Sequence, residues 1–285
     1  MQKIWVCGAR GQIGQAVNDV VDKLEFEMLD TDVDDLDVTD TDEVLRFGEM
    51  NRPDIIINCS GMTDISSCEE NPSQAFKVNA LGARNLAIVA AKMQAKMVQL
   101  STDDVFDGKS TEPYTEFDIT NPGTVYGKSK LAGENYVKKF TTKHFIVRST
   151  WVYGKGQNFI NGFLKKVDAG EQLSIASDQF GSPTSANELA RFLLHLVHTS
   201  EYGTYHATNK GVCSRYAFAQ EILKMTGKTA SMQPVPTVMS DFSKVRPAYA
   251  VLDNFIMSMV PIYDFPDWQD SLREYLEERG LYHAE

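Results

Sequence analysis

Cysteine is scarce in this chain of 285 residues, and its four cysteines never form a Cys-x-x-Cys pair. That spacing excludes the common zinc and dithiol redox motifs. Long apolar runs are also missing, because nothing approaches the roughly 20 consecutive apolar residues of a membrane-spanning helix. We expect no signal peptide at the N-terminus. The sequence therefore predicts a cytoplasmic protein that does not associate with membranes.

Basic residues are outnumbered, with 28 Lys and Arg against 39 Asp and Glu and a net charge of -11. Binding to nucleic acid requires a basic face that neutralises phosphates, so this class of partner is excluded. Acidic residues crowd the segment 30–43, where eight of fourteen positions are Asp or Glu. A phosphate-rich ligand must therefore be bound by local basic side chains and backbone amides.

Short apolar runs alternate with helical patterns through the first half of the chain. The predicted strands are residues 3–7, 25–29, 55–59, 97–101 and 144–148. The predicted helices between them are residues 12–24, 41–50, 72–92 and 128–140. Strands separated by helix-length segments indicate βαβ units and a parallel sheet. The expected fold class is α/β, a doubly wound parallel sheet of the Rossmann type.

The alternation loosens after about residue 153. Helical patterns cover residues 159–169, 187–198, 216–226 and 268–279, with a short strand at 203–207. Five prolines between Pro234 and Pro266 indicate a loop-rich region. We expect residues 1–155 to form a dinucleotide-binding Rossmann domain. Residues 156–285 should form mostly a smaller substrate-binding lobe, with some segments returning to the Rossmann domain.

Three glycines, Gly8, Gly11 and Gly14, follow the first predicted strand and open the first helix. Such a loop lets backbone amides approach a pyrophosphate at a helix N-terminus, which predicts an NADH or NADPH site. Asp30, about twenty residues on, is placed to accept hydrogen bonds from the adenine ribose, which favours NADH. Arg10 in the loop is suited to the 2′-phosphate of NADPH. The two signals conflict, and the choice of coenzyme stays open.

Tyr126 and Lys130 are four residues apart at a predicted helix start, so they share one face. Bringing a tyrosine pKa from about 10 to near 7 requires roughly 4 kcal/mol. One ammonium at about 4 Å in a partly screened site supplies that much. Thr102, which follows the strand at 97–101, can donate a hydrogen bond to a carbonyl. This set of residues is suited to reducing a ketone with a hydride and a proton.

With these motifs, the chain resembles the extended short-chain dehydrogenase/reductase family over nearly its whole length. The similarity is strongest at the glycine loop, at 101–108, 126–134, 148–154 and 178–184, and at Arg246-Pro247. Within that family it resembles enzymes that use NAD(P)H to reduce the 4-keto group of a dTDP-linked 6-deoxy sugar. The resemblance implies Thr102, Tyr126 and Lys130 as the catalytic set.

The resemblance also implies two groups of binding residues. Those expected around the coenzyme are Gly11, Gln12, Ile13, Asp37, Val38, Cys59, Ser60, Gly61 and Asn79, besides Tyr126 and Lys130. Those expected to face the sugar are Thr63, Asp103 and Trp151. Two further substrate-binding candidates are Asp104, beside Asp103 in the sequence, and Arg246, which either meets the nucleotide phosphate or caps the lobe.

The chain departs from the family pattern at three places. Asp104 stands where the family usually has tyrosine, and Ile65-Ser66-Ser67 replaces a common Val-Asp-Lys. Both bear on the exact sugar. Some members bind magnesium at a dimer interface through a glutamate that is Ala16 here. We therefore expect no metal, and a homodimer stays an open possibility.

Two other functions remain as alternatives. Asp103-Asp104 imitates the acid–base pair of a nucleotide-sugar 4,6-dehydratase, since two carboxylates in different environments can divide those roles. The regulatory subunit of methionine adenosyltransferase also resembles this family, binds a dinucleotide and performs no catalysis. Net consumption of reduced coenzyme separates these alternatives from the reductase.

Overall fold

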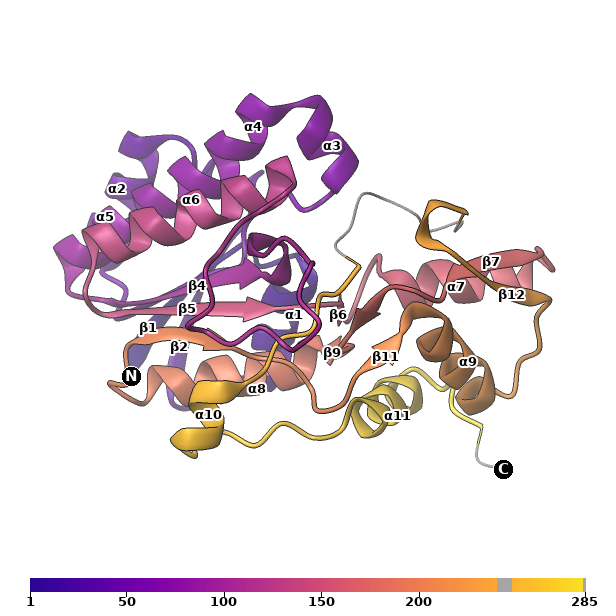
Figure 1. Ribbon diagram of the computed structural model, residues 1–285. Helices are drawn as coiled ribbons and strands as arrows, with labels where there is room; N and C mark the ends of the chain where they lie inside the picture. Colours follow the sequence, from indigo (N-terminus) through magenta and orange to yellow (C-terminus); the bar gives the residue numbers. More distant parts are fainter. Residues whose placement is uncertain (240–247, 284–285) are drawn as a thin grey trace.

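A computed structural model describes residues 1–239 and 248–283 of the chain (Figure 1). Its centre is a six-stranded sheet in the order β10-β5-β4-β3-β1-β2. The strands are β1 (Gln2–Cys7), β2 (Phe26–Thr31), β3 (Ile55–Asn58), β4 (Lys96–Thr102), β5 (His144–Ser149) and β10 (Gly203–His206). Every neighbouring pair in this sheet is parallel. The predicted α/β fold with a parallel sheet is confirmed.

Side chains alternate between the two faces of the sheet, as the period of a strand requires. Ile4 and Val6 of β1 join one buried cluster, whereas Trp5 and Cys7 join another on the opposite face. Helices α1 (Gln12–Val20) and α8 (Ala186–Val197) pack on the first face. Helices α2 (Thr41–Asn51), α5 (Ala83–Met93) and α6 (Val125–Phe140) cover the second (Figure 1).

The helix expected at 72–92 is continuous but not uniform. It consists of α4 (Pro72–Phe76), a π-helical turn η1 (Lys77–Gly82) and α5. A π-helical turn is rare and occurs most often at functional sites. Two further short elements are α3 (Ile65–Glu70), which precedes α4, and η2 (Asp103–Val105), which follows β4. The sequence pattern predicted one continuous helix here and did not predict that six of its residues form the wider turn.

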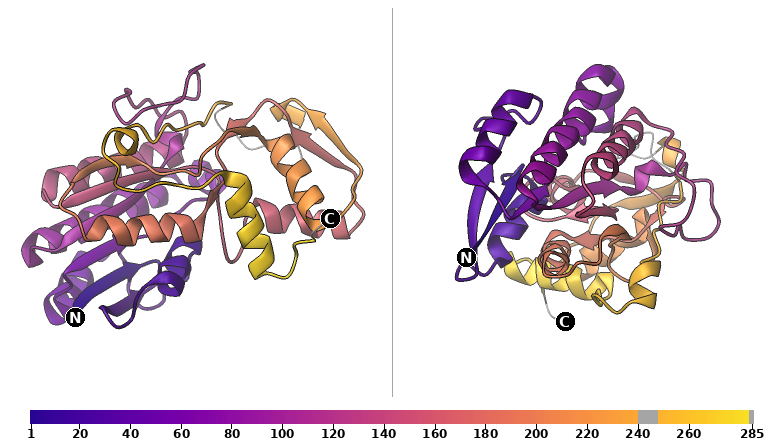
Figure 2. Two further views of the ribbon diagram at one scale, coloured as in Figure 1. Left: turned by 90° about the horizontal axis from the view of Figure 1, so that it is seen from below. Right: turned by 90° about the vertical axis from the view of Figure 1, so that its left-hand side faces the viewer.

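A smaller lobe lies beside the carboxyl ends of the strands (Figures 1 and 2). Its helices are α7 (Phe159–Asp168), α9 (Arg215–Thr226) and α11 (Trp268–Glu278). Its strand pairs are β7 (Leu173–Ala176) with β12 (Met232–Val235), β6 (Val152–Tyr153) with β9 (Thr184–Ser185), and β8 (Phe180–Gly181) with β11 (Cys213–Ser214). The short η3 (Thr237–Met239) and α10 (Phe255–Met259) complete the elements. The buried cluster of this lobe combines aliphatic side chains with aromatic ones such as Tyr153, Phe163 and Phe218.

Two segments that follow residue 155 belong to the sheet rather than to the lobe. Helix α8 packs against α1, and β10 pairs with β5 at the edge of the sheet. The chain therefore passes between the sheet and the lobe more than once. Within the residues that the structure describes, no helix is long and apolar enough to span a membrane.

Candidate active site

The glycine loop between β1 and α1 is packed too closely for side chains. Gly8 has a φ of +75°, and a β-carbon there would lie 2.8 Å from the backbone nitrogen of Ser60. A β-carbon at Gly14 would lie 2.4 Å from the carbonyl oxygen of Gly8. The absence of side chains brings backbone and helix N-terminus together, as binding of a pyrophosphate requires. These residues fit a dinucleotide.

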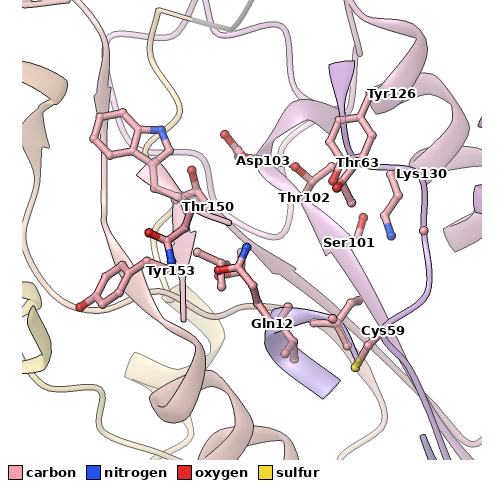
Figure 3. A pocket seen from close by; sticks show the side chains of 18 of the residues that line it. Gln12, Cys59, Thr63, Ser101, Thr102, Asp103, Tyr126, Lys130, Thr150 and Tyr153 are labelled. Carbon is pink, nitrogen blue, oxygen red and sulfur yellow. Dashed lines mark hydrogen bonds between the residues drawn. The ribbon is translucent and has the colours of Figure 1, made fainter. Parts of the chain in front are cut away.

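Two cavities share this loop, and together they suit an extended ligand. The first, here called the catalytic cavity, has a volume of about 420 Å³ (Figure 3). The second, here called the acidic cavity, has about 410 Å³ and includes Asp32 and Asp37. Both are lined by Gly11, Cys59, Ser60 and Gly61. A dinucleotide lying across these shared residues can place one half in each cavity.

Most of the predicted site residues come together in these cavities. The catalytic cavity is lined by Gly11, Gln12, Ile13, Cys59, Ser60, Gly61, Thr63, Thr102, Asp103, Tyr126, Lys130 and Trp151. The acidic cavity is lined by Gly8, Asp37 and Val38, together with shared residues. Five predicted residues, Arg10, Gly14, Asp30, Asn79 and Asp104, line neither cavity. Arg246 lies outside the residues that the structure describes.

Tyr126 and Lys130 lie at the first turns of α6, whose start is fixed by the Thr124 side chain. The Thr124 hydroxyl accepts a hydrogen bond from the Gly127 amide at 2.9 Å. Tyr126, Lys130 and Thr102 gather on one side of the catalytic cavity (Figure 3). The Thr102 hydroxyl donates to the Asp103 carboxylate at 2.9 Å. The predicted catalytic set is therefore assembled around one space.

The Lys130 ammonium is held in a buried environment. Burial lowers its pKa to about 8, against an opposing attraction from Glu134. A β-carbon on Gly61 would lie 3.7 Å from Lys130 Nζ, so the ammonium lies directly beside the Gly61 backbone. Burial also raises the pKa of Cys59 to about 12, so this neighbouring thiol remains protonated near neutral pH. Lys130 is therefore a cation near neutral pH, with a pKa only slightly above that pH.

Asn79 does not line the catalytic cavity but contacts residues next to those that do. Its side chain, in the π-helical turn, donates to the Ser129 hydroxyl at 2.8 Å and to the Met62 carbonyl at 2.9 Å. It also accepts from the Met62 amide at 2.8 Å. Ser129 in turn donates to the Tyr126 carbonyl. Asn79 thus fastens the 59–62 segment to the turn of α6 that carries Tyr126 and Lys130.

A buried ion pair fixes the same helix to the sheet. Arg148 on β5 donates to both oxygens of Glu134 at 2.9 and 2.8 Å, and Ser101 donates to Glu134 at 2.6 Å. Both charged side chains are almost fully buried. Burial and the Arg148 charge lower the pKa of His206 to about 3, so its ring is neutral beside the arginine. The bidentate geometry orients α6 relative to β4 and β5.

The two residues predicted to select the coenzyme lie differently from the expectation. Strand β2 continues through Thr31, so Asp30 is an exposed residue within it and Asp32 is the first acid beyond it. Asp32 lines the acidic cavity, and its carboxylate accepts from the Arg10 amide at 2.9 Å. The Arg10 guanidinium pairs with Asp34 at 2.8 Å and with Asp35 at 2.7 Å. The Arg10 side chain is thus held by two carboxylates that lie outside the lining of the acidic cavity.

Asp103 and Asp104 face different surroundings. Asp103 lines the catalytic cavity, whereas Asp104 is 1% exposed and does not. The backbone of Asp104 packs against Gly127, where a β-carbon would come within 2.0 Å of the Asp104 carbonyl oxygen. The structure therefore does not present the two carboxylates side by side in the cavity.

Several lining residues were not predicted from the sequence. They are Leu100, Ser101, Ser149, Thr150, Val152, Tyr153, Asn158, Phe159, Arg215 and Phe218. The hydroxyls of Ser149, Thr150 and Tyr153 are buried without a hydrogen-bond partner among the described residues. Ser149 could have been found from register, because it pairs with Thr102 across β4 and β5. Arg215 lies 64 residues beyond Trp151, and no sequence spacing links the two.

The described residues contain no group of three or more His, Cys, Asp or Glu side chains arranged to hold a metal ion. That no metal is needed stays a prediction.

Comparison with known proteins identifies the family. Residues 1–280 match the family model described as the RmlD substrate binding domain. The spore coat polysaccharide biosynthesis protein SpsK of Bacillus subtilis is 35% identical over 98% of this chain and 99% of its own length. The dTDP-4-dehydrorhamnose reductase of Aggregatibacter actinomycetemcomitans is 32% identical over 96% of this chain and 98% of its own.

Solved structures agree with these relatives. A dTDP-4-dehydrorhamnose reductase from Clostridium acetobutylicum superposes with a TM-score of 0.95 at 40% identity, covering 98% of this chain and all of that one. The enzyme of the same name from Bacillus anthracis, solved with NADP, gives a TM-score of 0.94 at 35% identity with the same coverage. The chain therefore belongs to the RmlD family of dTDP-4-dehydrorhamnose reductases and is an oxidoreductase that uses NAD(P)H.

Proposed function

We propose that this chain reduces the 4-keto group of dTDP-4-dehydrorhamnose to give dTDP-L-rhamnose, with NADPH or NADH as the reductant. The observation that carries the proposal is the joint placement of Thr102, Tyr126 and Lys130 in the catalytic cavity, which adjoins the glycine loop. Relatives that match nearly the full length of the chain bear the name of this reaction.

Tyr126 is the proton donor in this mechanism, and Lys130 and Thr102 assist it. Bound coenzyme supplies the hydride. The Lys130 ammonium stabilises the phenolate that Tyr126 forms when its hydroxyl proton passes to the sugar oxygen. Thr102 turns its hydroxyl from Asp103 toward the substrate carbonyl and orients it. Asn79 and the Glu134–Arg148 pair keep α6 in place during these steps.

The placement of Asp104 weighs against a dehydratase. Such an enzyme needs two carboxyl groups at the reacting carbons, and only Asp103 of the pair lines the catalytic cavity. A regulatory subunit without catalysis has no need for the complete Thr102, Tyr126 and Lys130 set.

The division of labour within the chain is also a proposal. We assign coenzyme binding to residues 1–155 and the nucleotide part of the substrate mostly to residues 156–285. A cytoplasmic location and a homodimer stay predictions.

The experiment that tests the function is coenzyme oxidation with dTDP-4-dehydrorhamnose, followed at 340 nm in wild type and in Tyr126→Phe. Removing the hydroxyl while keeping the ring should lower kcat by at least about 100-fold and leave coenzyme affinity nearly unchanged. Tyr136→Phe, on the same helix and outside both cavities, serves as the matched control. Near wild-type kcat in Tyr126→Phe would remove the proposed proton donor. A wild type that oxidises no coenzyme would remove the function itself.

A further inference from the structure

The catalytic cavity continues from the reacting groups into the lobe along one line of the chain. Thr102 ends β4 and pairs with Ser149 at the end of β5. Thr150, Trp151 and Tyr153 follow directly and line the cavity too. Figure 3 shows Thr150 and Tyr153 on the side opposite Tyr126 and Lys130. A substrate whose sugar lies at Tyr126 must therefore extend its remaining part past Thr150 toward the lobe.

Arg215 is the cation at that far end. Its guanidinium carbon lies 3.4 Å from the centroid of the Trp151 ring and 4.7 Å from that of Phe159. All three residues line the cavity. Guanidinium groups stacked on aromatic rings lose little further freedom when they bind an anion, because the flat group is already oriented. Arg215 is therefore prepared to bind phosphate oxygens.

The local backbone is arranged to create this stack. Trp151 adopts a φ of +47°, a conformation that non-glycine residues rarely take. A β-carbon on Gly181 would lie 2.6 Å from the Trp151 ring, so the ring needs glycine there. Arg215 begins α9, and the positive N-terminal end of a helix adds to the favourable field for an anion.

Thr150 gives an independent sign of a polar ligand in the same cavity. The residue is 1% exposed, and its hydroxyl has no hydrogen-bond partner among the described residues. A buried hydroxyl without a partner costs stability, so such groups often serve a ligand. The described residues that line the cavity include two cations, Lys130 and Arg215, and the mechanism already uses Lys130.

We propose that Arg215 binds the diphosphate of the nucleotide sugar, with the Thr150 hydroxyl donating a second hydrogen bond from the strand side. This inference rests on the proposed function for the class of substrate. It gives the strongly acidic chain a local basic group for a dianionic ligand, in the lobe rather than at the coenzyme loop.

The test measures binding by calorimetry to coenzyme-saturated enzyme, with dTDP and thymidine as the two probes. Arg215→Gln should weaken dTDP about 10- to 100-fold and leave thymidine within about twofold, because only dTDP carries the diphosphate. Arg279→Gln is the matched control, since Arg279 also stacks on a ring, that of Tyr275, but lies outside the cavity. Coenzyme affinity should be unchanged in both variants.

Thr150→Val provides a second test that does not disturb the stack. Loss of a hydroxyl that has no hydrogen-bond partner in residues 1–239 and 248–283 should leave the unfolding midpoint unchanged or raised, while dTDP affinity falls about fivefold or more. An unchanged dTDP affinity in Arg215→Gln overturns the proposal. So does an equal loss for thymidine and dTDP, which would assign Arg215 to the base or to packing. If Arg215→Gln does not fold, the affinity of the wild type for dTDP is measured at increasing salt concentration instead. An affinity that does not change with salt would also overturn the proposal.

These results are separate from the fate of the proposed function. Arg215-dependent binding of dTDP in an enzyme that never oxidises coenzyme with the keto-sugar would leave the diphosphate site standing and remove the reaction. Normal turnover of the keto-sugar, with a dTDP affinity that Arg215→Gln does not change, would leave the reaction standing and remove the diphosphate site.

Discussion

Lys130→Met should make the coenzyme-free protein more stable while abolishing its activity. The Lys130 ammonium is buried, and burial lowers its pKa from 10.5 to about 8. Each unit of pKa corresponds to about 1.4 kcal/mol, so keeping this charge costs the native state about 3 kcal/mol at pH 7. Methionine fills a similar volume without a charge. The free energy of unfolding should therefore rise by up to about 3 kcal/mol.

The pH dependence of this gain follows from the direction of the shift. Between about pH 8 and 10.5, unfolded chains still bind a proton at Lys130 that native chains have released, so wild type gains stability as pH rises. Below pH 8 both states are protonated and the cost stays constant. The advantage of Lys130→Met should be flat below pH 8 and shrink steadily toward pH 10.5.

Urea unfolding at a series of pH values measures both effects, and Lys128→Met is the matched control. Lys128 lies on the same helix two residues earlier and is exposed, so its replacement should change stability little at any pH. Lys130→Met that is no more stable than wild type at pH 7 would refute the reasoning. A stability difference that persists unchanged at pH 10 would refute it as well.

Three further predictions concern the coenzyme, the helix anchor and the metal. Replacing both Asp34 and Asp35 by Asn removes the ion pairs that hold Arg10. The KM for NADPH should then fall roughly three- to tenfold relative to that for NADH. Steady-state kinetics with both coenzymes measures this, and equal changes would show that Arg10 does not read the 2′-phosphate. Glu134→Gln leaves Arg148 buried without its counter-charge and should cost about 3–5 kcal/mol in urea unfolding. A loss below about 1 kcal/mol would contradict the anchoring role. Finally, EDTA should leave activity unchanged, and an activity that EDTA removes and magnesium restores would show that a metal is needed.

Local patterns were enough to predict the core of the fold. The strands of the sheet have buried apolar side chains on both faces, and such runs differ from the amphipathic helices between them. Tyr126 and Lys130 could be paired in advance because four residues make one helical turn. The glycines could be interpreted because the three lie between the end of the first strand and the first turn of the first helix.

Predictions that depended on a boundary or on distant packing fared differently. Strand β2 extends two residues beyond its predicted end, which moves Asp32 rather than Asp30 to the acidic cavity. Asp104 follows Asp103 directly, yet the 3-10 turn after β4 places only Asp103 in the lining. Arg215 reaches the cavity through the packing of the lobe, which the local pattern around it does not encode.

The late return of β10 and α8 to the sheet has a consequence for the newborn chain on the ribosome. When the first 155 residues have emerged, β5 still lacks its neighbour β10, and the sheet face that carries Ile4 and Val6 lacks α8. An unpaired strand edge beside bare apolar surface invites association with other chains. The native sheet can close only after His206 has left the exit tunnel, when most of the lobe has already been synthesised. The sheet and the lobe therefore complete their folding together rather than one after the other.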